Sequence, residues 1–226
     1  MHKKYEFGLI GNCSFSALVE KNGNVCWLCW PRFDSDFTIG TLVDEDQGHF
    51  FVRPAEKEYE TKQYYLPNSP ILATEFKSES GRFRLLDFAP RFRQYHRTYK
   101  PLILHRRIEH LEGTPLIKVG CQPVFNYGET ETTTFISSNH LKYTSAKAKI
   151  RLYSTLPLSY IEKQTPFALR ESQNLILTYG TEIHDNIAHI TQSHLQETID
   201  YWQYWVEGLS LGNVYQEQVI RSAITL

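Results

Sequence analysis

The sequence has little cysteine, no long apolar run and no excess of charge of either sign. Four cysteines among 226 residues argue against a disulfide framework and predict reduced thiols in the cytoplasm. No segment approaches the roughly eighteen apolar residues of a membrane-spanning helix, and the first residues do not form a signal peptide. The formal net charge is −1, so we expect neither nucleic acid nor a membrane as partner, because both are bound through concentrated Lys and Arg.

Motifs of common catalytic and metal sites are also missing. The sequence holds no P-loop, no dinucleotide-binding glycine fingerprint and no nucleophile elbow. Cys26 and Cys29 have the spacing of a zinc-ligand pair, but no second pair follows, and the apolar Trp27-Leu28 between them favours a buried strand. The nine histidines are scattered at spacings that do not suit a metal. We therefore predict no metal ion and no cofactor.

Close pairs of acidic residues offer no catalytic dyad. Glycoside hydrolysis needs two carboxyl groups that face each other across the bound sugar. The close pairs here are expected to share a turn or one face of a strand: Asp34 with Asp36, Asp44 with Asp46, and Glu129 with Glu131. No catalytic residue is therefore predicted in this chain.

Apolar and polar residues alternate over most of the first 180 residues, which is the pattern of β-strands. Asn22-Gly23 lies between two such segments and predicts a tight hairpin with positive φ at both positions. Phe83, Leu85 and Asp87 are expected to share one face of their strand. Strands are expected at residues 14–20, 24–30, 38–44, 49–53, 57–65, 71–78, 82–88, 102–111, 116–123, 132–137, 141–144, 149–154 and 174–179. The fold is therefore predicted to be mainly β, with two antiparallel sheets packed as a sandwich.

The end of the chain changes to a helical period. One apolar face over residues 193–207 is formed by Leu195, Ile199, Trp202 and Val206. Ser193 is the expected N-cap of this helix, and Gly208 its end. A second helix is expected from Asn213 to the last residue. Because it stays apolar to its end, we interpret it as cut and expect it to fray or to associate with another copy of the chain; an ordinary C-terminal helix is the alternative.

Residues 91–97 combine basic and aromatic side chains in the order Arg-Phe-Arg-Gln-Tyr-His-Arg. Such a run can bind phosphate or a single nucleic-acid strand. The neutral net charge favours a solvated loop or an interface with an acidic neighbouring domain.

Five blocks of the sequence resemble one enzyme family. They read YEFGLIGNCSFSALVEKNGNVCWLCWPRFDS at residues 5–35, TEFKSESGRFRLLDFAP at 74–90, QPVFNYG at 122–128, YWQYW at 201–205 and VIRSAITL at 219–226. The blocks resemble the start of bacterial glycoside hydrolase family 15 proteins, which are the glucoamylase-like and trehalase-like enzymes. The first and third blocks are the most specific.

The resemblance implies a β-sandwich of the supersandwich type over residues 1–190, a helical linker over 191–212, and the truncated start of an (α/α)6 catalytic barrel over 213–226. It also implies an enzyme that cleaves an α-linked glucoside with inversion, with water as nucleophile, without a metal, and with both catalytic glutamates in the barrel. This chain would then frame the active site of its own barrel. The alternatives are a stand-alone carbohydrate-binding sandwich, and a sugar epimerase that would need a histidine and a carboxylate in one cleft.

The end of the first block supplies the candidate substrate-proximal residues Trp30, Arg32 and Asp34. Pro31 is expected to end the strand that holds Trp27, because proline cannot donate to the sheet ladder. A tryptophan can stack on a sugar face, and an arginine can hold hydroxyl groups in its fork of donors. The resemblance implies that this loop approaches the mouth of the barrel. The alternative is that Arg32 and Asp34 pair with each other or with the barrel.

Overall fold

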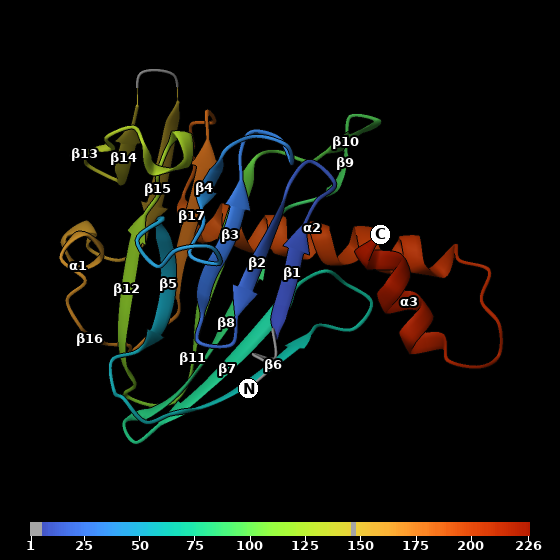
Figure 1. Ribbon diagram of the computed structural model, residues 1–226. Helices are drawn as coiled ribbons and strands as arrows, with labels where there is room; N and C mark the ends of the chain where they lie inside the picture. The colour runs from blue at the N-terminus through green and yellow to red at the C-terminus, as the bar shows by residue number, and fades with distance from the viewer. Residues whose placement is uncertain (1–5, 146–147) are drawn as a thin grey trace.

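The structure, a computed structural model, describes residues 6–145 and 148–226. It contains two large antiparallel sheets that face each other (Figure 1). The first sheet has the order β1-β2-β3-β5-β12-β16, with β4 paired to β3. Its strands are β1 (Phe7–Gly11), β2 (Ser16–Glu20), β3 (Asn24–Cys29), β4 (Phe37–Ile39), β5 (His49–Pro54), β12 (Leu116–Gln122) and β16 (Phe167–Ala168). The predicted mainly β, two-sheet fold is confirmed.

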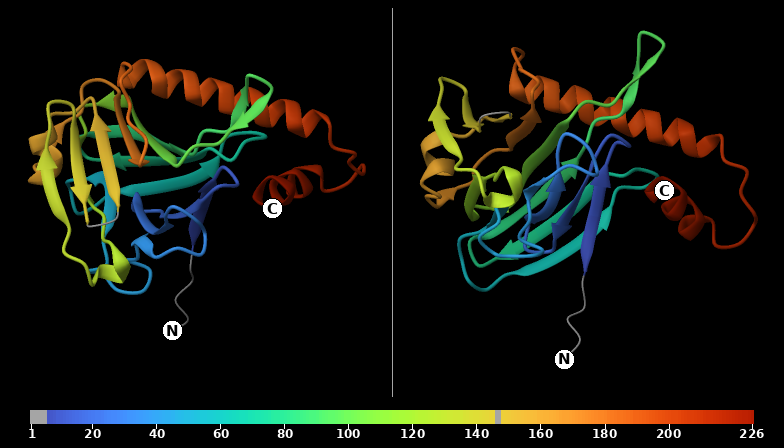
Figure 2. Two further views of the ribbon diagram at one scale, coloured as in Figure 1. Left: turned by 90° about the horizontal axis from the view of Figure 1, so that it is seen from above. Right: turned by 45° about the horizontal axis from the view of Figure 1, so that its top comes forward.

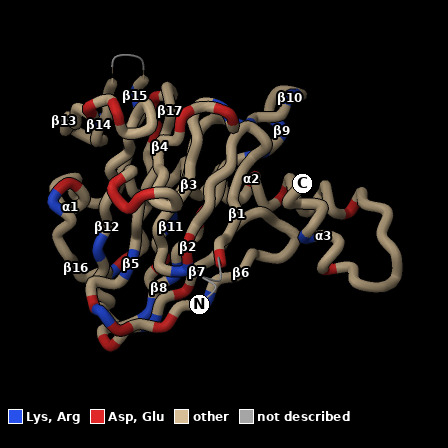
Figure 3. Tube along the Cα trace, in the orientation of Figure 1, with Lys and Arg blue, Asp and Glu red and all other residues tan. Residues whose placement is uncertain are grey.

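The second sheet is continuous over eight strands in the order β13-β14-β15-β17-β11-β8-β7-β6. Its strands are β6 (Glu60–Tyr65), β7 (Leu72–Ser78), β8 (Gly81–Phe88), β11 (Ile103–Gly113), β13 (Thr133–Ile136), β14 (His140–Thr144), β15 (Lys149–Ser154) and β17 (Gln173–Tyr179). Basic and acidic positions are interspersed along the chain (Figure 3), which agrees with the near-zero net charge.

The main core lies between the two sheets. β1 and β2 alternate buried and half-buried side chains along their whole lengths, as expected for strands with one face on a core. Phe76 of β7 stacks on Phe83 of β8, with 4.7 Å between ring centroids. Large side chains of the first sheet, such as Phe50 and Leu28, belong to the same core and are fully buried.

A fully buried ion pair crosses this core. Arg106 of β11 donates to both carboxylate oxygens of Asp87 on β8, at 2.7 Å from Nε and 3.1 Å from Nη2. The same guanidinium reaches the opposite sheet, where it donates to the backbone carbonyls of Phe50 at 2.5 Å and Gly23 at 2.7 Å. Burial raises the pKa of the Asp87 carboxyl, and the charge of Arg106 opposes this rise. The prediction that Asp87 shares one face of its strand with Phe83 and Leu85 is confirmed, and this face is the inner one.

The turn between β2 and β3 differs from the expected two-residue form. Gly23 has φ 81°, and its N–H donates to the carbonyl of Glu20 at 3.0 Å, whereas Asn22 is not among the described residues with positive φ. The loop therefore has three residues and needs a left-handed conformation only at its last position. A β-carbon at Gly23 would collide with the carbonyl oxygen of Val52, so glycine is also required by space.

Helix α2 (Ile187–Glu207) covers the outer face of the second sheet, where it contacts β17, and it also contacts the separate strand β9 (Phe92–Gln94) (Figure 2). Its N-cap is Asn186, whose side chain accepts from the N–H of His189 at 3.0 Å. The expected start at Ser193 is therefore wrong, because Asn186 is a strong cap about two turns earlier and Ile187 and Ile190 already pack on the sheet. The expected end at Gly208 is confirmed.

Helix α3 (Gln216–Thr225) folds back toward the sandwich. Ile224 is buried with Trp202 and Val206 of α2, and Arg221 donates to the carbonyl of Ser69 at 2.8 Å. The helix thus has a partner within the chain, in contrast to the expectation that it frays or needs another copy. Its apolar Leu226 nevertheless remains fully exposed.

Residues 91–97 form a hairpin and not the expected loop. β9 (Phe92–Gln94) pairs with β10 (Arg97–Tyr99), and the turn between them places Tyr95 and His96 at positive φ. Phe92 is buried against His194 of α2, while Tyr95 at the tip is 90% exposed. Neither turn residue is a usual turn former, which explains why the sequence pattern did not reveal the hairpin. Two short elements, α1 (Leu158–Glu162) and η1 (Asn126–Gly128), complete the chain.

Candidate functional site

The candidate residues lie on the loop that follows β3, which we name the Trp30 loop and define as residues 30–36. The peptide between Trp30 and Pro31 is cis. Arg32 and Ser35 close a turn through two hydrogen bonds. The N–H of Ser35 donates to the carbonyl of Arg32 at 3.2 Å, and the N–H of Arg32 donates to the hydroxyl of Ser35 at 3.2 Å. This turn carries the segment away from the sheet before β4 begins.

Arg32 and Asp34 pair with each other on this loop. Arg32 Nε donates to Asp34 Oδ1 at 2.9 Å, and Nη2 donates to Oδ2 at 3.0 Å. Their side chains are 75% and 70% exposed, so the pair stands in water. The remaining guanidinium N–H groups are free to bind an incoming acceptor, because this fork uses only two of its five donors.

Trp30 has a different environment from Arg32 and Asp34. It is only 3% exposed, with its ring edge-on to Phe15 at 5.3 Å and to Tyr179 at 6.1 Å between centroids. The structure therefore places the three predicted residues on one loop but does not bring Trp30 together with the exposed pair. Trp30 instead forms part of the wall of a cavity.

This cavity, which we name the Trp30 cavity, has a volume of about 440 Å³ and lies between the two sheets at one end of the sandwich. It is bounded by the Trp30 loop, by β4, and by the segment 124–130. The described residues that line it are Trp30, Pro31, Ser35, Asp36, Phe37, Thr38, Val124, Phe125, Asn126, Thr130, Ser145, Ala148 and Tyr179. The blocks at residues 5–35 and 122–128, the most specific parts of the sequence resemblance, thus meet at one place.

One wall of the cavity is held by contacts between residues 36–38 and the segment 124–130. Val124 N–H donates to the carbonyl of Thr38 at 2.9 Å. Tyr127 packs edge-on against Phe37, with 5.2 Å between centroids. A hydrogen bond to Asp36 and the charge of that carboxylate raise the pKa of the Tyr127 phenol. Asp36 itself is an exposed residue of the cavity lining.

The lining offers polar groups of a particular kind. Ser35, Thr130 and Tyr179 contribute hydroxyl groups, and Asn126 contributes an amide. Trp30 Nε1 is buried and makes no hydrogen bond to any described residue. Leaving such a donor unpaired costs about 1–3 kcal/mol. Lining of this composition suits recognition of a hydroxyl-rich molecule more than proton transfer between paired acids.

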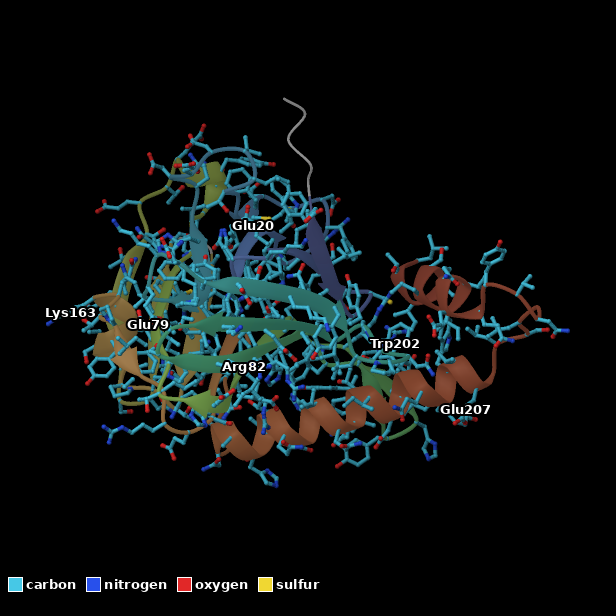
Figure 4. All side chains as sticks on the ribbon, turned by 90° about the horizontal axis from the view of Figure 1, so that it is seen from below. Glu20, Glu79, Arg82, Lys163, Trp202 and Glu207 are labelled. Carbon is cyan, nitrogen blue, oxygen red and sulfur yellow. The ribbon has the colours of Figure 1, made fainter. Side chains whose placement is uncertain are left out.

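A second cavity, the Trp202 cavity, lies between β1 and α3 and has a volume of about 320 Å³. Trp202 projects from α2 into this region (Figure 4). Its Nε1 and the Nε of Arg221 are also buried without a hydrogen-bond partner in the part of the chain that the structure describes. The guanidinium of Arg221 lies 4.0 Å from the ring centroid of Tyr65, and burial lowers its pKa.

The sequence pattern did not reveal a buried histidine pair. His105 Nε2 of β11 lies 3.0 Å from His194 Nδ1 of α2, and His105 Nδ1 lies 3.3 Å from the hydroxyl of Thr191. Burial lowers the pKa of both, that of His194 to about 4. The pair joins α2 to the sheet. In the part of the chain that the structure describes, the partners of His105 in this pair are Thr191 and His194, and neither is a carboxylate.

Within residues 6–145 and 148–226, no three His, Cys, Asp or Glu side chains gather as metal ligands would. Cys26 and Cys29 are both buried free thiols, and burial raises the pKa of Cys26 to about 12. No described helix is long and apolar enough to span a bilayer.

The fold and the site define a two-sheet β-sandwich with a helical C-terminal segment and a cavity at one end. Residues 5–160 match the family model described as "Trehalase-like, N-terminal", and the chain belongs to this family. A protein named trehalase from Thermoplasma volcanium is 30% identical over 97% of this chain and 36% of its own length. Trehalase 1 of Sulfolobus acidocaldarius is 30% identical over 87% of this chain and 33% of its own.

A trehalase of Mycolicibacterium smegmatis is 26% identical over 98% of this chain and 37% of its own length. The chain thus spans about a third of the length of the curated relatives it matches. The predicted relation to the N-terminal part of a glycoside hydrolase is confirmed.

Proposed function

We propose that this chain is the non-catalytic N-terminal domain of a cytoplasmic enzyme that hydrolyses an α-linked glucoside, with trehalose as the first substrate to test. The observation that carries the proposal is the similarity over 97% of this chain to a protein named trehalase, of which it covers 36%. The enzyme would belong to glycoside hydrolase family 15 and act by inversion, with water as nucleophile. Its acid and base would lie in a catalytic barrel outside this chain.

The charges of the described residues support a non-catalytic role. The one fully buried carboxylate among them, Asp87, is bonded to Arg106 inside the core and is closed to a sugar. Asp34 and Asp36 lie on the same loop, and Asp34 is paired with Arg32, whereas an inverting mechanism needs two carboxyl groups on opposite sides of a bound sugar. In the proposal, the sandwich covers residues 1–190, the linker 191–212, and the barrel begins at 213.

The proposal assigns the Trp30 loop to the face that frames the active site. Arg32 and Asp34 are exposed and preformed as a pair, so Arg32 is available to a substrate or to the catalytic domain without loss of core packing. Trp30 would act from inside the cavity, since it is buried. The alternative of a stand-alone carbohydrate-binding sandwich is favoured by the same cavity, and the test below separates the two.

The test is an activity screen of the full-length gene product against trehalose, maltose and dextran, beside the 226-residue chain alone. We expect glucose release by the full-length protein and none by the chain. In the full-length protein, Arg32→Ala is expected to lower kcat/KM about tenfold, the size of one charged hydrogen bond. The matched control is Lys77→Ala, which removes another exposed ion pair, with Glu60, far along the second sheet. A full-length product without hydrolytic activity on any α-glucoside would overturn the proposal.

A further inference from the structure

The Trp30 cavity has the size and position of a ligand site. At about 440 Å³ it falls within the range of 300–1,000 Å³ that is typical of small-molecule pockets. It opens at the end of the sandwich, next to the exposed Arg32 and Asp34 pair. A molecule held there would sit beside the loop that the proposed function places at the active-site face.

The charge of the lining selects against anions. Among the described lining residues, none is Lys, Arg or His, and Asp36 supplies a negative charge at the rim. In the described part of the lining, a phosphate or carboxylate group would find no cation, and Asp36 would repel it. A neutral ligand that donates hydrogen bonds to Asp36 is favoured.

The lining also matches the two chemical faces of a sugar ring. Phe37, Phe125 and the ring of Trp30 provide apolar walls for C–H groups. The hydroxyl of Tyr179 and the amide of Asn126 each donate and accept, as hydroxyl groups require. The ring of Trp30 belongs to this wall, while its Nε1–H is closed to solvent and lacks an acceptor among the described residues.

We propose that the Trp30 cavity is a binding site for one neutral pyranose, a glucosyl unit of the α-linked glucoside. The assignment rests on the proposed function for the identity of the sugar. It adds a site within this chain that binds sugar without the catalytic domain, and it assigns Asp36, Asn126 and Tyr179 as hydrogen-bonding residues beside Trp30.

The test uses the indole N–H signals of the 226-residue chain in a ¹H–¹⁵N NMR spectrum, titrated with trehalose, maltose and glucose. The chain has four tryptophans, so four indole signals are expected, and Trp30→Phe identifies one of them. We expect a saturable shift of the Trp30 signal with a dissociation constant of about 1–10 mM, typical of a single small site. The Trp202 signal is the internal control, because its indole is equally buried and unpaired but lines the other cavity.

Two hydroxyl deletions sharpen the test. Tyr179→Phe keeps the ring of the cavity wall and is expected to weaken binding about fivefold, whereas Tyr204→Phe, on the exposed side of α2, leaves it unchanged. No saturable shift at Trp30, an equal shift at Trp202, or equal effects of the two variants would overturn the inference. These outcomes are independent of the activity screen: hydrolysis by the full-length protein without a Trp30 shift removes this site and leaves the proposed function standing.

Discussion

The molecule contains two Arg–Asp pairs with almost the same fork geometry and opposite surroundings. Arg106 and Asp87 are completely buried between the sheets, whereas Arg32 and Asp34 are 75% and 70% exposed on the Trp30 loop. In both pairs Nε and Nη2 each donate to a different carboxylate oxygen within 3.1 Å. The difference teaches that geometry alone does not set the energetic role of an ion pair, because water screens one pair and not the other.

The buried pair also has partners that the exposed pair lacks. Arg106 also donates to the carbonyls of Phe50 and Gly23 on the side of the opposite sheet, so its charge is surrounded by acceptors from two strands and a turn. Removing one member leaves an unpaired charge inside the core. Removing a member of the exposed pair leaves a charge in water.

The largest expected effect comes from the buried pair. Asp87→Ala should lower the free energy of unfolding by about 3–5 kcal/mol, because Arg106 would keep its charge without a counter-ion. Denaturant titration followed by circular dichroism measures this. The double variant Asp87→Leu with Arg106→Met should be less destabilised than Asp87→Ala alone, since it buries no charge. A loss below about 1 kcal/mol for Asp87→Ala would show that the core tolerates the unpaired guanidinium.

The His105–His194 pair extends the comparison to a buried pair that is stable only while neutral. In the unfolded chain a histidine takes up its proton near pH 6.5, whereas in the native protein the pKa of His194 is lowered to about 4. The unfolded state therefore binds more protons between these pH values, and stability falls as the pH falls. The expected loss from His194 is about 3 kcal/mol between pH 6.5 and pH 4.

Unfolding titrations at several pH values test this. His194→Gln should flatten the dependence in that window, while His189→Gln, at an exposed position of the same helix, should leave the wild-type slope. Parallel curves for wild type and His194→Gln would mean that carboxylates, and not this histidine, set the acid limit of stability.

The smallest expected effect belongs to the exposed pair. Arg32→Ala should change the free energy of unfolding by less than about 0.5 kcal/mol, because exposed ion pairs contribute little. The measurement is the denaturant midpoint at low and at high salt. At each salt concentration, the midpoints of the wild type and of the variant should agree. A loss near that of Asp87→Ala would show that the loop pair supports the fold, and the contrast between the two pairs would disappear.

The sequence predicted the sheets and the place of Asp87, because both depend on period-2 alternation within single segments. Phe83 and Leu85 mark the inner face, and Asp87 follows two residues later. It did not predict that Arg106, nineteen positions away, bonds Asp87, or that His105 meets His194 across 89 positions. Such pairings depend on strand order and on the path of α2, which periodicity does not contain.

Local signals that were present explain other differences. Asn186 followed by Ile187 and Ile190 is a cap before an apolar periodic run, and this signal marks the true start of α2. For the Trp30 loop, the sequence placed the three candidate residues on one segment but did not indicate that Trp30 is buried while Arg32 is exposed. The cavity forms only where segments 30–38 and 124–130 meet. A local sequence pattern does not show that two segments so far apart in the chain lie close together in space. Whether Trp30, Arg32 and Asp34 contact substrate stays a prediction.

The length of α2 has a mechanical consequence. With 21 residues the helix is about 30 Å long, and its first half is fixed to the sheet while its second half carries α3. The His105–His194 contact lies within the helix, and about 20 Å of α2 extends beyond it toward α3. A tilt of about 10° about this contact would displace the far end of the helix by roughly 3 Å. A small change in the packing of α2 on the sandwich would therefore produce a larger displacement at α3, and at any surface that contacts α3.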